Sequence, residues 1–239
     1  EELQYIVDRV TVMRDGQYIG THAVRDMTRE GIIHMMVGRD LAAEFPKETF
    51  TRGEERLRVE GLTRRGVFQE VSFRLHQGEI VGLTGLVGAG RTEVARAIFG
   101  ADRIDSGRMV LDGRPLVVRS PQDAIRNGIG LLTEDRKNQG LVLGMSVREN
   151  ATIANLSKLV DLLFVNHKKE RQAVKEYVES LRIKTPSIEQ TAQNLSGGNQ
   201  QKVVLAKWLF TESRLLIFDE PTRGIDVGAK AEIYKLMNE

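Results

Sequence analysis

Residues 85–92 read Gly-Leu-Val-Gly-Ala-Gly-Arg-Thr, which matches the phosphate-binding pattern G-x-x-x-x-G-K-[ST] except that Arg91 replaces the lysine. Gly88 and Gly90 allow the backbone to approach phosphate oxygens and to point successive N–H groups at them. The helix expected to begin near Arg91 would add its positive dipole end, and the Thr92 hydroxyl can ligate Mg²⁺. The alternative is a plain glycine turn between a strand and a helix.

Arg91 is a departure from that pattern with a chemical consequence. Lysine places a compact point charge between phosphates, whereas the guanidinium group is a larger planar fork. We therefore expect nucleotide binding to survive and catalytic positioning to weaken. The residues that we expect to contact nucleotide are Gly85, Leu86, Val87, Gly88, Ala89, Gly90, Arg91, Thr92 and Glu93.

Two acids follow a short apolar run near the end of the sequence. Residues 215–218 read Leu-Leu-Ile-Phe, which is typical of a central parallel strand, and Asp219 and Glu220 come directly after it. Open α/β sheets bind ligands at the carboxyl ends of such strands. Asp219, with Thr92, would hold Mg²⁺, and Glu220 would be the catalytic residue that polarises the attacking water. The alternative is a pair of solvated acids at a strand end.

Residues 195–201, Leu-Ser-Gly-Gly-Asn-Gln-Gln, form a third candidate site. A serine and two glycines at the start of a helix make a second anion-binding nest. The alternative is that Ser196 is only an N-cap. The chain order of phosphate loop, this segment and the two acids favours the anion site. The residues singled out here are Leu195, Ser196, Gly197, Gly198, Asn199 and Gln200.

These segments need strands and helices that bring them together. We expect a buried strand over residues 80–84 before the phosphate loop, and after it a helix that buries Val94, Ala97 and Ile98. The other expected elements are strands at 57–61, 71–75 and 128–132, hairpins around 15–16 and 112–113, the end of a helix at 3–10, and helices at 28–36, 121–127, 146–183, 200–210 and 227–237.

The composition fits a folded protein and excludes several kinds of site. Of 239 residues, 41% are hydrophobic and 28% are charged, which provides a sizeable core and argues against global disorder. The absence of cysteine excludes disulfides, thiol nucleophiles and cysteine-ligated metals. The net charge of +2 gives no nucleic-acid signature. We find no signal peptide and no membrane span, and we interpret the start at Glu1 as the start of a fragment.

The three motifs together resemble the ABC-transporter ATPases. Residues 195–201 are similar to the signature of that family, and residues 218–226, Phe-Asp-Glu-Pro-Thr-Arg-Gly-Ile-Asp, are similar to its acidic strand and D-loop. The match is closer to one subfamily, the tandem ATPase subunits of bacterial monosaccharide importers of the ribose, galactose and xylose type. The segments that resemble this subfamily are 88–93, 134–137, 140–141, 145–150 and 219–230.

The resemblance implies a fold and a domain organisation. The fold is α/β: a P-loop NTPase (ABC ATPase) core with an antiparallel β subdomain and a helical signature subdomain, truncated at the C-terminus. Residues 1–45 would be the C-terminal tail of a first ABC ATPase domain, 46–56 a linker, and 57–239 a second ABC ATPase domain that lacks the switch-histidine region. The histidines present, for which a surface or packing role is expected, are His22, His34, His76 and His167.

The resemblance also assigns roles to single residues. In these ATPases two ATP molecules lie between two facing domains, so the signature residues would contact an ATP held by the partner domain. Glu134 occupies the position of the Q-loop glutamine, so an acid replaces an amide there, and Asp226 occupies the D-loop position. Phe68 is the nearest candidate for the aromatic that stacks on adenine, with a core position as the alternative.

The activity implied is ATP binding and hydrolysis, with ATP and Mg²⁺ as cofactors, coupled to monosaccharide import through a membrane permease. The partners would be the permease subunits, the first ATPase domain of the same full-length chain and, indirectly, a periplasmic or extracellular sugar-binding protein. The location would be peripheral, at the cytoplasmic face of the cell inner membrane. We expect the isolated chain to bind nucleotide at most, with negligible hydrolysis.

Three other functions stay open at this point. The imported solute could be a nucleoside or a signalling molecule. A nucleic-acid-associated ABC ATPase would need coiled-coil insertions or basic patches, and because residues 168–171 are only a short charge cluster we expect no nucleic-acid partner. A regulatory module that binds nucleotide without hydrolysis is favoured by Arg91 and opposed by Glu220.

Overall fold

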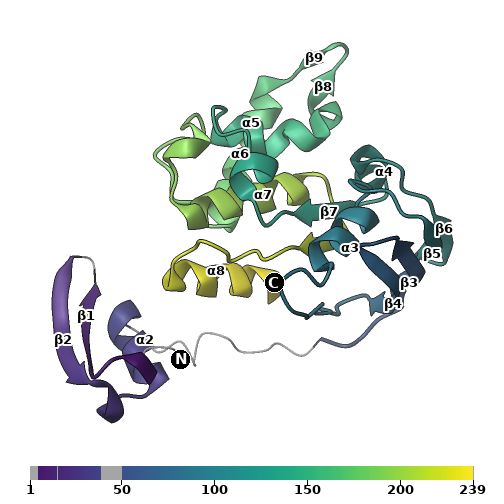
Figure 1. Cartoon of the computed structure of the whole chain (residues 1–239). Helices are drawn as coiled ribbons and strands as arrows, with labels where there is room; N and C mark the ends of the chain where they lie inside the picture. The colour runs from purple at the N-terminus through teal and green to yellow at the C-terminus, as the bar shows by residue number, and fades with distance from the viewer. Residues whose placement is uncertain (1–4, 15, 39–49, 239) are drawn as a thin grey trace. The chain divides into compact units, whose positions relative to one another are not determined.

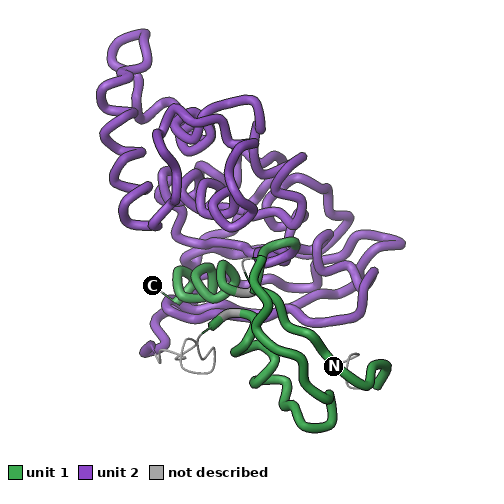
Figure 2. The backbone as a smooth tube through the Cα atoms, turned by 90° about the vertical axis from the view of Figure 1, so that its left-hand side faces the viewer, with its two compact units in different colours: residues 1–48, 224–239 green, residues 49–223 purple. Residues whose placement is uncertain are grey.

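The computed structural model describes residues 5–14, 16–38 and 50–238, with the elements labelled as in Figure 1. The chain forms two compact units, distinguished by colour in Figure 2. The smaller unit consists of Glu1–Glu48 and Gly224–Glu239, and the larger unit consists of Thr49–Arg223.

The described residues of the smaller unit include a β-hairpin and the helices α2 and α8. Its elements are β1 (Arg9–Arg14), β2 (Gln17–Ala23), the 3₁₀ turn η1 (Val24–Asp26), α2 (Arg29–Val37) and α8 (Val227–Asn238). β1 and β2 are antiparallel, and Gly16 supplies the left-handed turn backbone, with φ 77°. The hairpin predicted around 15–16 is confirmed, although residue 15 itself lies outside the described residues. Of the helix expected over 3–10, residues 5 and 6 are helical, but the expectation is wrong from residue 7 on. Val10 and Val12 are β-branched and pair with β2 instead.

Helices α2 and α8 each begin at a capping side chain. The Thr28 hydroxyl accepts a hydrogen bond from the backbone N–H of Gly31 at 3.1 Å, and α2 ends at Gly38, whose φ is 81°. The Asp226 carboxylate accepts from the backbone N–H of Ala229 at 2.8 Å in the first turn of α8. The two predicted helices are therefore confirmed, and both starts follow local capping chemistry.

The larger unit contains an antiparallel sheet with the strand order β4–β3–β5–β6. Its strands are β3 (Glu55–Arg64), β4 (Phe68–His76), β5 (Ser106–Leu111) and β6 (Arg114–Leu116). Leu57 and Val59 on β3 are buried two residues apart, which is the period that buries one face of a sheet. The turn between β5 and β6 is formed by Asp112 and Gly113, both with positive φ. The strands and the hairpin predicted here are confirmed.

A parallel pair of strands follows in the same unit. β7 (Ile129–Leu132) pairs with β10 (Leu215–Phe218), and the elements that flank this pair in the sequence include α3 (Arg91–Ile98) and α4 (Pro121–Arg126). The predicted buried face of α3, formed by Val94, Ala97 and Ile98, is confirmed. Within the described residues β10 has a neighbour on one side only, so the expectation of a central strand is not met.

The buried strand predicted over residues 80–84 is wrong. These residues form no strand, and the side chains of Ile80 and Leu83 are 62% and 44% exposed. A strand needs a neighbour that accepts and donates its backbone hydrogen bonds. In the described part of the chain no strand pairs with this segment, so its apolar character alone does not bury it.

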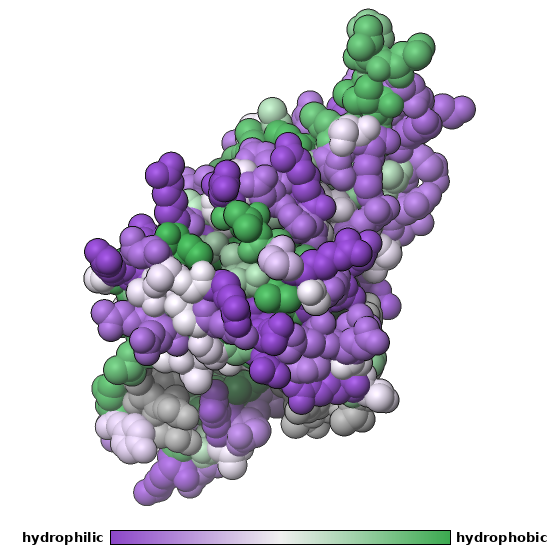
Figure 3. Space-filling model, turned by 90° about the vertical axis from the view of Figure 1, so that its right-hand side faces the viewer, coloured by the Kyte–Doolittle hydropathy of each residue, from purple (hydrophilic) through white to green (hydrophobic). Residues whose placement is uncertain are grey.

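The remaining elements of the larger unit are mainly helical and lie together on one side of it (Figure 1). They are the π-helix η2 (Arg136–Gly140), α5 (Val147–Thr152), η3 (Ile153–Leu159), β8 (Val160–Asp161), β9 (Phe164–Val165), α6 (His167–Ser180), η4 (Ala192–Asn194) and α7 (Gly197–Phe210). The helical prediction for 146–183 missed the β8–β9 hairpin, whose tip carries exposed apolar side chains (Figure 3).

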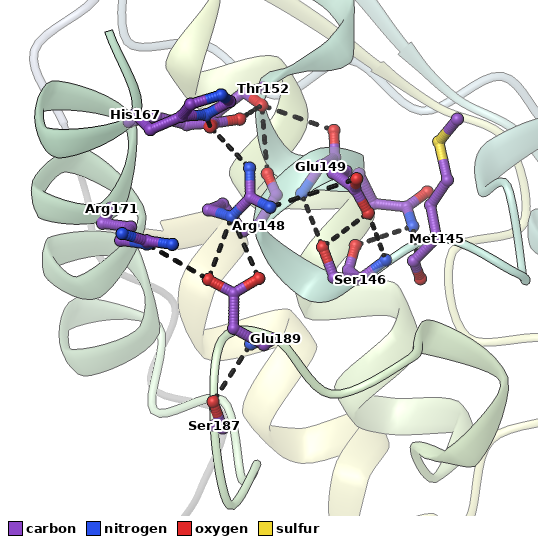
Figure 4. A network of polar contacts seen from close by, with 11 residues as sticks. Met145, Ser146, Arg148, Glu149, Thr152, His167, Arg171, Ser187 and Glu189 are labelled. Atoms are coloured by element: carbon purple, nitrogen blue, oxygen red, sulfur yellow. Dashed lines mark hydrogen bonds and ion pairs between the residues drawn. The ribbon is translucent and has the colours of Figure 1, made fainter.

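An ion-pair network joins α5 to α6 and to the loop before η4 (Figure 4). Arg148 donates to Glu170 at 2.5 Å and, through Nε, to both carboxylate oxygens of Glu189 at 3.1 Å. The Thr152 hydroxyl donates to Glu170 at 2.8 Å, and His167 Nδ1 lies 3.0 Å from the same carboxylate. Burial raises the pKa of Glu170, but these hydrogen bonds outweigh it and hold the pKa below its usual range.

Candidate functional site

The phosphate loop is an open turn that leads directly into α3. The backbone N–H of Ala89 donates to the Leu86 carbonyl at 3.1 Å, and Gly88 and Gly90 have φ values of 83° and 85°. A Cβ atom added at Gly90 would lie 3.1 Å from the backbone oxygen of Val67, so the second glycine is required by both conformation and space. Leu86 and Val87 are exposed, and the loop backbone is therefore accessible to a ligand.

The two predicted acids lie against the phosphate loop. The backbone N–H of Asp219 donates to the Leu132 carbonyl at 2.9 Å and extends the β10–β7 ladder by one step. Its carboxylate accepts a hydrogen bond from the Thr92 hydroxyl at 3.1 Å. Arg91 Nη2 donates to Glu220 Oε1 at 3.4 Å. Residues separated by 127 and 129 positions along the chain thus meet at one place.

The Asp219 carboxylate differs electrostatically from an ordinary surface carboxylate. Burial raises the pKa of Asp219, the hydrogen bond from Thr92 opposes that effect, and the negative charge of Glu220 adds to it. Glu220 has φ 44°, a left-handed backbone conformation that is uncommon for a residue other than glycine. Strained backbone of this kind is frequent at ligand sites.

The donor set at this place fits Mg²⁺ bound together with a nucleotide. A hydroxyl from Thr92 and a carboxylate from Asp219 are the hard oxygen ligands that Mg²⁺ prefers. Among the described residues no group of three or more His, Asp or Glu side chains could hold a metal ion without other ligands. Mg²⁺ usually takes only one or two protein oxygens and completes its shell with water and phosphate oxygens.

Glu134, which the sequence predicts at the Q-loop position, forms an ion pair with Arg223. Arg136 Nη1 donates to the backbone oxygen of Arg223 at 2.8 Å, and Arg136 Nε donates to Gln200 Oε1 at 3.4 Å. These contacts join the Glu134 segment to the chain that follows the two acids and to the first turn of α7. The sequence places Arg136 and Arg223 in segments that resemble the subfamily, but it does not reveal their contacts, because these join distant segments of the chain.

The signature segment forms the start of α7. The helix begins at Gly197 and not at Gln200, so the expected start is wrong by three residues and both glycines belong to the first turn. Ser196 is the N-cap residue by position, but its side chain accepts no capping hydrogen bond from the backbone. The Ser196 hydroxyl instead accepts from the Asn199 side chain at 2.9 Å. The plain N-cap alternative is therefore not realised, and Ser196 is exposed.

Two further candidates, Phe68 and Asp226, have local structural roles. Phe68 is only 6% exposed at the start of β4, which agrees with the core alternative and leaves no ring face for adenine. Asp226 belongs to the smaller unit, where it caps α8. His76 Nδ1 lies 3.0 Å from Glu79 and 2.7 Å from Arg52, so its polar partners are local.

Comparison with known proteins places this arrangement in a family. Residues 68–223 match the ABC transporter family. The chain is 55% identical, over its whole length, to a protein of Agrobacterium fabrum named "Putative ribose/galactose/methyl galactoside import ATP-binding protein 1", and 52% identical to the "Ribose import ATP-binding protein RbsA" of Geobacillus kaustophilus. All of this chain aligns with each, but it spans only 48% of either relative's length.

Solved structures agree on the fold. A nucleotide-free ATP-binding cassette from an ABC transporter matches with a TM-score of 0.64 at 22% identity, covering 77% of this chain and 76% of that one. A dimeric post-hydrolysis ATP-binding cassette bound to ADP and phosphate matches with a TM-score of 0.63 at 18% identity, covering 76% and 81%. The predicted α/β ABC ATPase fold is confirmed.

Within the described residues no helix is both long and apolar enough to cross a bilayer. The match over residues 68–223 and the full-length identity to the curated relatives show that this chain belongs to the ABC transporter family.

Proposed function

We propose that this chain binds ATP with Mg²⁺ and forms part of an ATPase that drives monosaccharide import. The observation that carries the proposal is the contact of Thr92 with Asp219 and of Arg91 with Glu220, which joins the phosphate loop to two acids. The names of the two relatives, both import ATP-binding proteins for ribose or related sugars, support the nucleotide and the class of solute.

Each residue of the site would have a separate task. The backbone N–H groups of residues 85–90 and the start of α3 would bind phosphate oxygens, and Arg91 would contact them through its guanidinium group. Thr92 and Asp219 would hold Mg²⁺, which neutralises phosphate charge when it is bound. Glu220, exposed beside them, would orient and polarise the attacking water.

The signature segment and the D-loop would act on a second nucleotide. Residues 195–200 would contact an ATP held by a facing ATPase domain, and Asp226 would lie in the same interface. Glu134 would take the place of the Q-loop amide, held by its ion pair with Arg223. The contact of Arg136 with Gln200 supports a mechanical link between the two regions.

The proposed partners follow from the length of the relatives and their names. Because the chain spans 48% of each relative, we propose that it works within a longer protein whose first ATPase domain faces this one. That protein would bind permease subunits at the cytoplasmic face of the inner membrane, where it would be peripheral. A periplasmic or extracellular sugar-binding protein would deliver the solute.

Reconstitution of the full-length protein with its permease tests this function. We expect ATP turnover that a monosaccharide stimulates and that Glu220→Gln reduces, while the isolated chain binds Mg-ATP with negligible turnover. Stimulation by a nucleoside or a signalling molecule and by no sugar would overturn the choice of solute. Robust steady-state turnover by the isolated chain would contradict the assignment of hydrolysis to the two-domain protein.

A second candidate function is a nucleotide site that does not hydrolyse ATP. The contact of Arg91 with Glu220 favours it, because it engages the proposed catalytic carboxylate with the residue that replaces the usual lysine. Turnover by the intact protein that is the same with and without Glu220→Gln would favour this candidate. A fall in turnover would favour hydrolysis at this site.

A further inference from the structure

The turn that begins at Glu220 has an unfavourable backbone conformation. The backbone N–H of Arg223 donates to the Glu220 carbonyl at 3.0 Å and closes the turn, with Pro221 at its second position. Glu220, at the first position, has φ 44°. A Cβ atom makes this left-handed conformation costly, so it persists only where the surrounding structure holds it. The turn therefore needs contacts from other segments of the chain.

Glu134 and Arg136 contact the last residue of this turn. Arg136 Nη1 donates to the Arg223 carbonyl at 2.8 Å, and the Arg223 side chain forms an ion pair with Glu134. The Arg223 side chain is 66% exposed, and an ion pair at such a position restrains geometry weakly. The bond from Arg136 is charge-assisted and its donor is half-buried, so it is the stronger restraint on the turn.

The Arg136 guanidinium group is also held by α7. Its Nε donates to Gln200 Oε1 at 3.4 Å, and the Gln200 amide donates to the Ala192 carbonyl at 3.1 Å. Gln200 is 4% exposed, so buried partners orient its amide. A guanidinium group donates to acceptors on two sides at once, which a compact ammonium group does less well. Arginine at position 136 therefore bridges the start of α7 and the turn that begins at Glu220.

The backbone that carries Arg136 is anchored on α7 as well. Arg136 begins the π-helix η2, and its carbonyl accepts from the N–H of Leu141 at 2.8 Å. At the other end of η2, Lys207 donates to the Gly140 carbonyl at 2.5 Å. A Cβ atom added at Gly140 would lie 3.2 Å from Val204 Cγ2, so η2 lies close against α7. The guanidinium group thus extends from a fixed base.

We propose that Arg136 is a positioning residue for Glu220. Through the Arg223 carbonyl it holds the turn that keeps the Glu220 carboxylate beside the phosphate loop. This role rests on the proposed function, in which that carboxylate polarises the attacking water. Without the guanidinium group the turn relaxes and the carboxylate moves, while Thr92 and Asp219 stay in place. Loss of Arg136 therefore impairs ATP hydrolysis and spares Mg-ATP binding.

Two measurements together test this role: turnover by the full-length protein reconstituted with its permease, and Mg-ATP binding by the purified chain. Arg136→Met removes both donors, and Arg136→Lys keeps one donor for the Arg223 carbonyl. The matched control is Arg126→Met at an exposed position of α4, and Glu220→Gln is the reference for loss of the carboxylate. Urea unfolding shows whether each variant is folded under the assay conditions.

We expect Arg136→Met to remove at least half of the turnover that Glu220→Gln removes, Arg136→Lys to remove less, and Arg126→Met to remove none. The Mg-ATP affinity should fall by no more than about twofold in these arginine variants. Unchanged turnover in Arg136→Met overturns the role, and so does an affinity that falls in proportion to turnover, which a merely structural arginine would produce. If Arg136→Met does not fold, Arg136→Lys decides: lower turnover with retained affinity supports the role, and unchanged turnover overturns it.

Failure of the proposed function gives a different result. Turnover by the wild-type protein that Glu220→Gln does not reduce would remove the catalytic carboxylate and, with it, the role of Arg136. Turnover that Glu220→Gln reduces and Arg136→Met leaves unchanged would overturn the role of Arg136 alone.

Discussion

Arg91 and Glu220 contact each other at the point where the phosphate loop meets the acidic strand end. The guanidinium group lies where the family pattern has an ammonium group, and it engages the carboxylate that we propose as catalytic. A ligand phosphate must therefore compete with Glu220 for Arg91. At the scale of single residues, this competition gives a physical reason for weak nucleotide binding at this site.

Arg91→Lys tests that competition. Lysine is a compact charge without the planar fork that reaches Glu220, so we expect ATP to bind more tightly, by up to about tenfold or 1.4 kcal/mol. The measurement is an equilibrium titration with Mg-ATP. The matched control is Arg126→Lys, which makes the same change at an exposed position of α4. ATP binding that Arg91→Lys lowers or abolishes would argue against a weak arginine site.

Lys207 gives a residue-scale prediction on pH. Its ammonium group is buried in α7 and donates to the Gly140 carbonyl at 2.5 Å, at the end of the π-helix that follows Glu134. Burial lowers the pKa of Lys207 to about 8. Between pH 8 and pH 10 the unfolded chain then binds this proton more tightly than the folded chain, so the free energy of unfolding gains a contribution that rises with pH.

Lys207→Met removes that contribution. We expect the difference in unfolding free energy, wild type minus variant, to rise by about 2 kcal/mol from pH 8 to pH 10. Urea titrations at several pH values measure it, and Lys175→Met at an exposed position of α6 should give a flat difference. A flat difference for Lys207→Met as well would show that the ammonium group is not desolvated.

At the scale of elements, α5, α6 and the loop before η4 are held together by Arg148 (Figure 4). Glu170 is 2% exposed, so its charge depends on this partner and on Thr152 and His167. Breaking a buried ion pair from one side leaves an uncompensated charge, which costs far more than the loss of an exposed pair. Arg171 also reaches Glu189, but from the solvent side.

Arg148→Met should lower the free energy of unfolding by roughly 3–5 kcal/mol, and Arg171→Met, its matched control, by no more than about 0.5 kcal/mol. The double variant Arg148→Met with Glu170→Gln should recover part of the loss, because the unpaired charge is gone. Thermal and urea unfolding check these values. Equal effects of the two arginine variants would contradict a buried role for Arg148.

Sequence reasoning succeeded where structure is decided locally. Thr28 at a helix start and the spacing of Val94, Ala97 and Ile98 each carry a signal within a few residues. It failed where a partner from a distant segment decides the outcome. Residues 80–84 have the composition of a strand but no paired neighbour in the described part of the chain. The β8–β9 hairpin has leucines where turn residues are expected, so no local rule indicates it.

The candidate site also has parts that the local sequence indicates and parts that depend on contacts between distant segments. The phosphate loop, the two acids and the signature segment are recognisable by residue type and order, and the loop and the acids do lie together. The ion pair of Glu134 with Arg223 and the contact of Arg136 with Gln200 are long-range. The burial of Phe68 argues against the hypothesis that its ring stacks on adenine. The sequence does not indicate that burial, because a single aromatic residue in a β-prone run can lie inside or at the surface.

At the scale of the whole molecule, the larger unit holds every predicted site residue except Asp226, and the family match at 68–223 falls entirely within it. The division into a first-domain tail, a linker and a second ATPase domain stays a prediction. The chain spans about half the length of the curated relatives it matches. We therefore expect the larger unit to carry the nucleotide site and expect turnover to require the longer protein.

Mg-ATP binding by the purified chain, measured by calorimetric titration, tests the central claim most directly. We expect saturable binding that requires Mg²⁺ and that Asp219→Asn and Thr92→Val each weaken at least tenfold. Asp112→Asn in the β5–β6 turn, where Asn tolerates the positive φ, should leave the affinity unchanged. Binding that does not depend on Mg²⁺ would contradict a site built from the phosphate loop and the acidic strand end. An ATP affinity that is equal in Asp219→Asn, Thr92→Val and Asp112→Asn would contradict it as well.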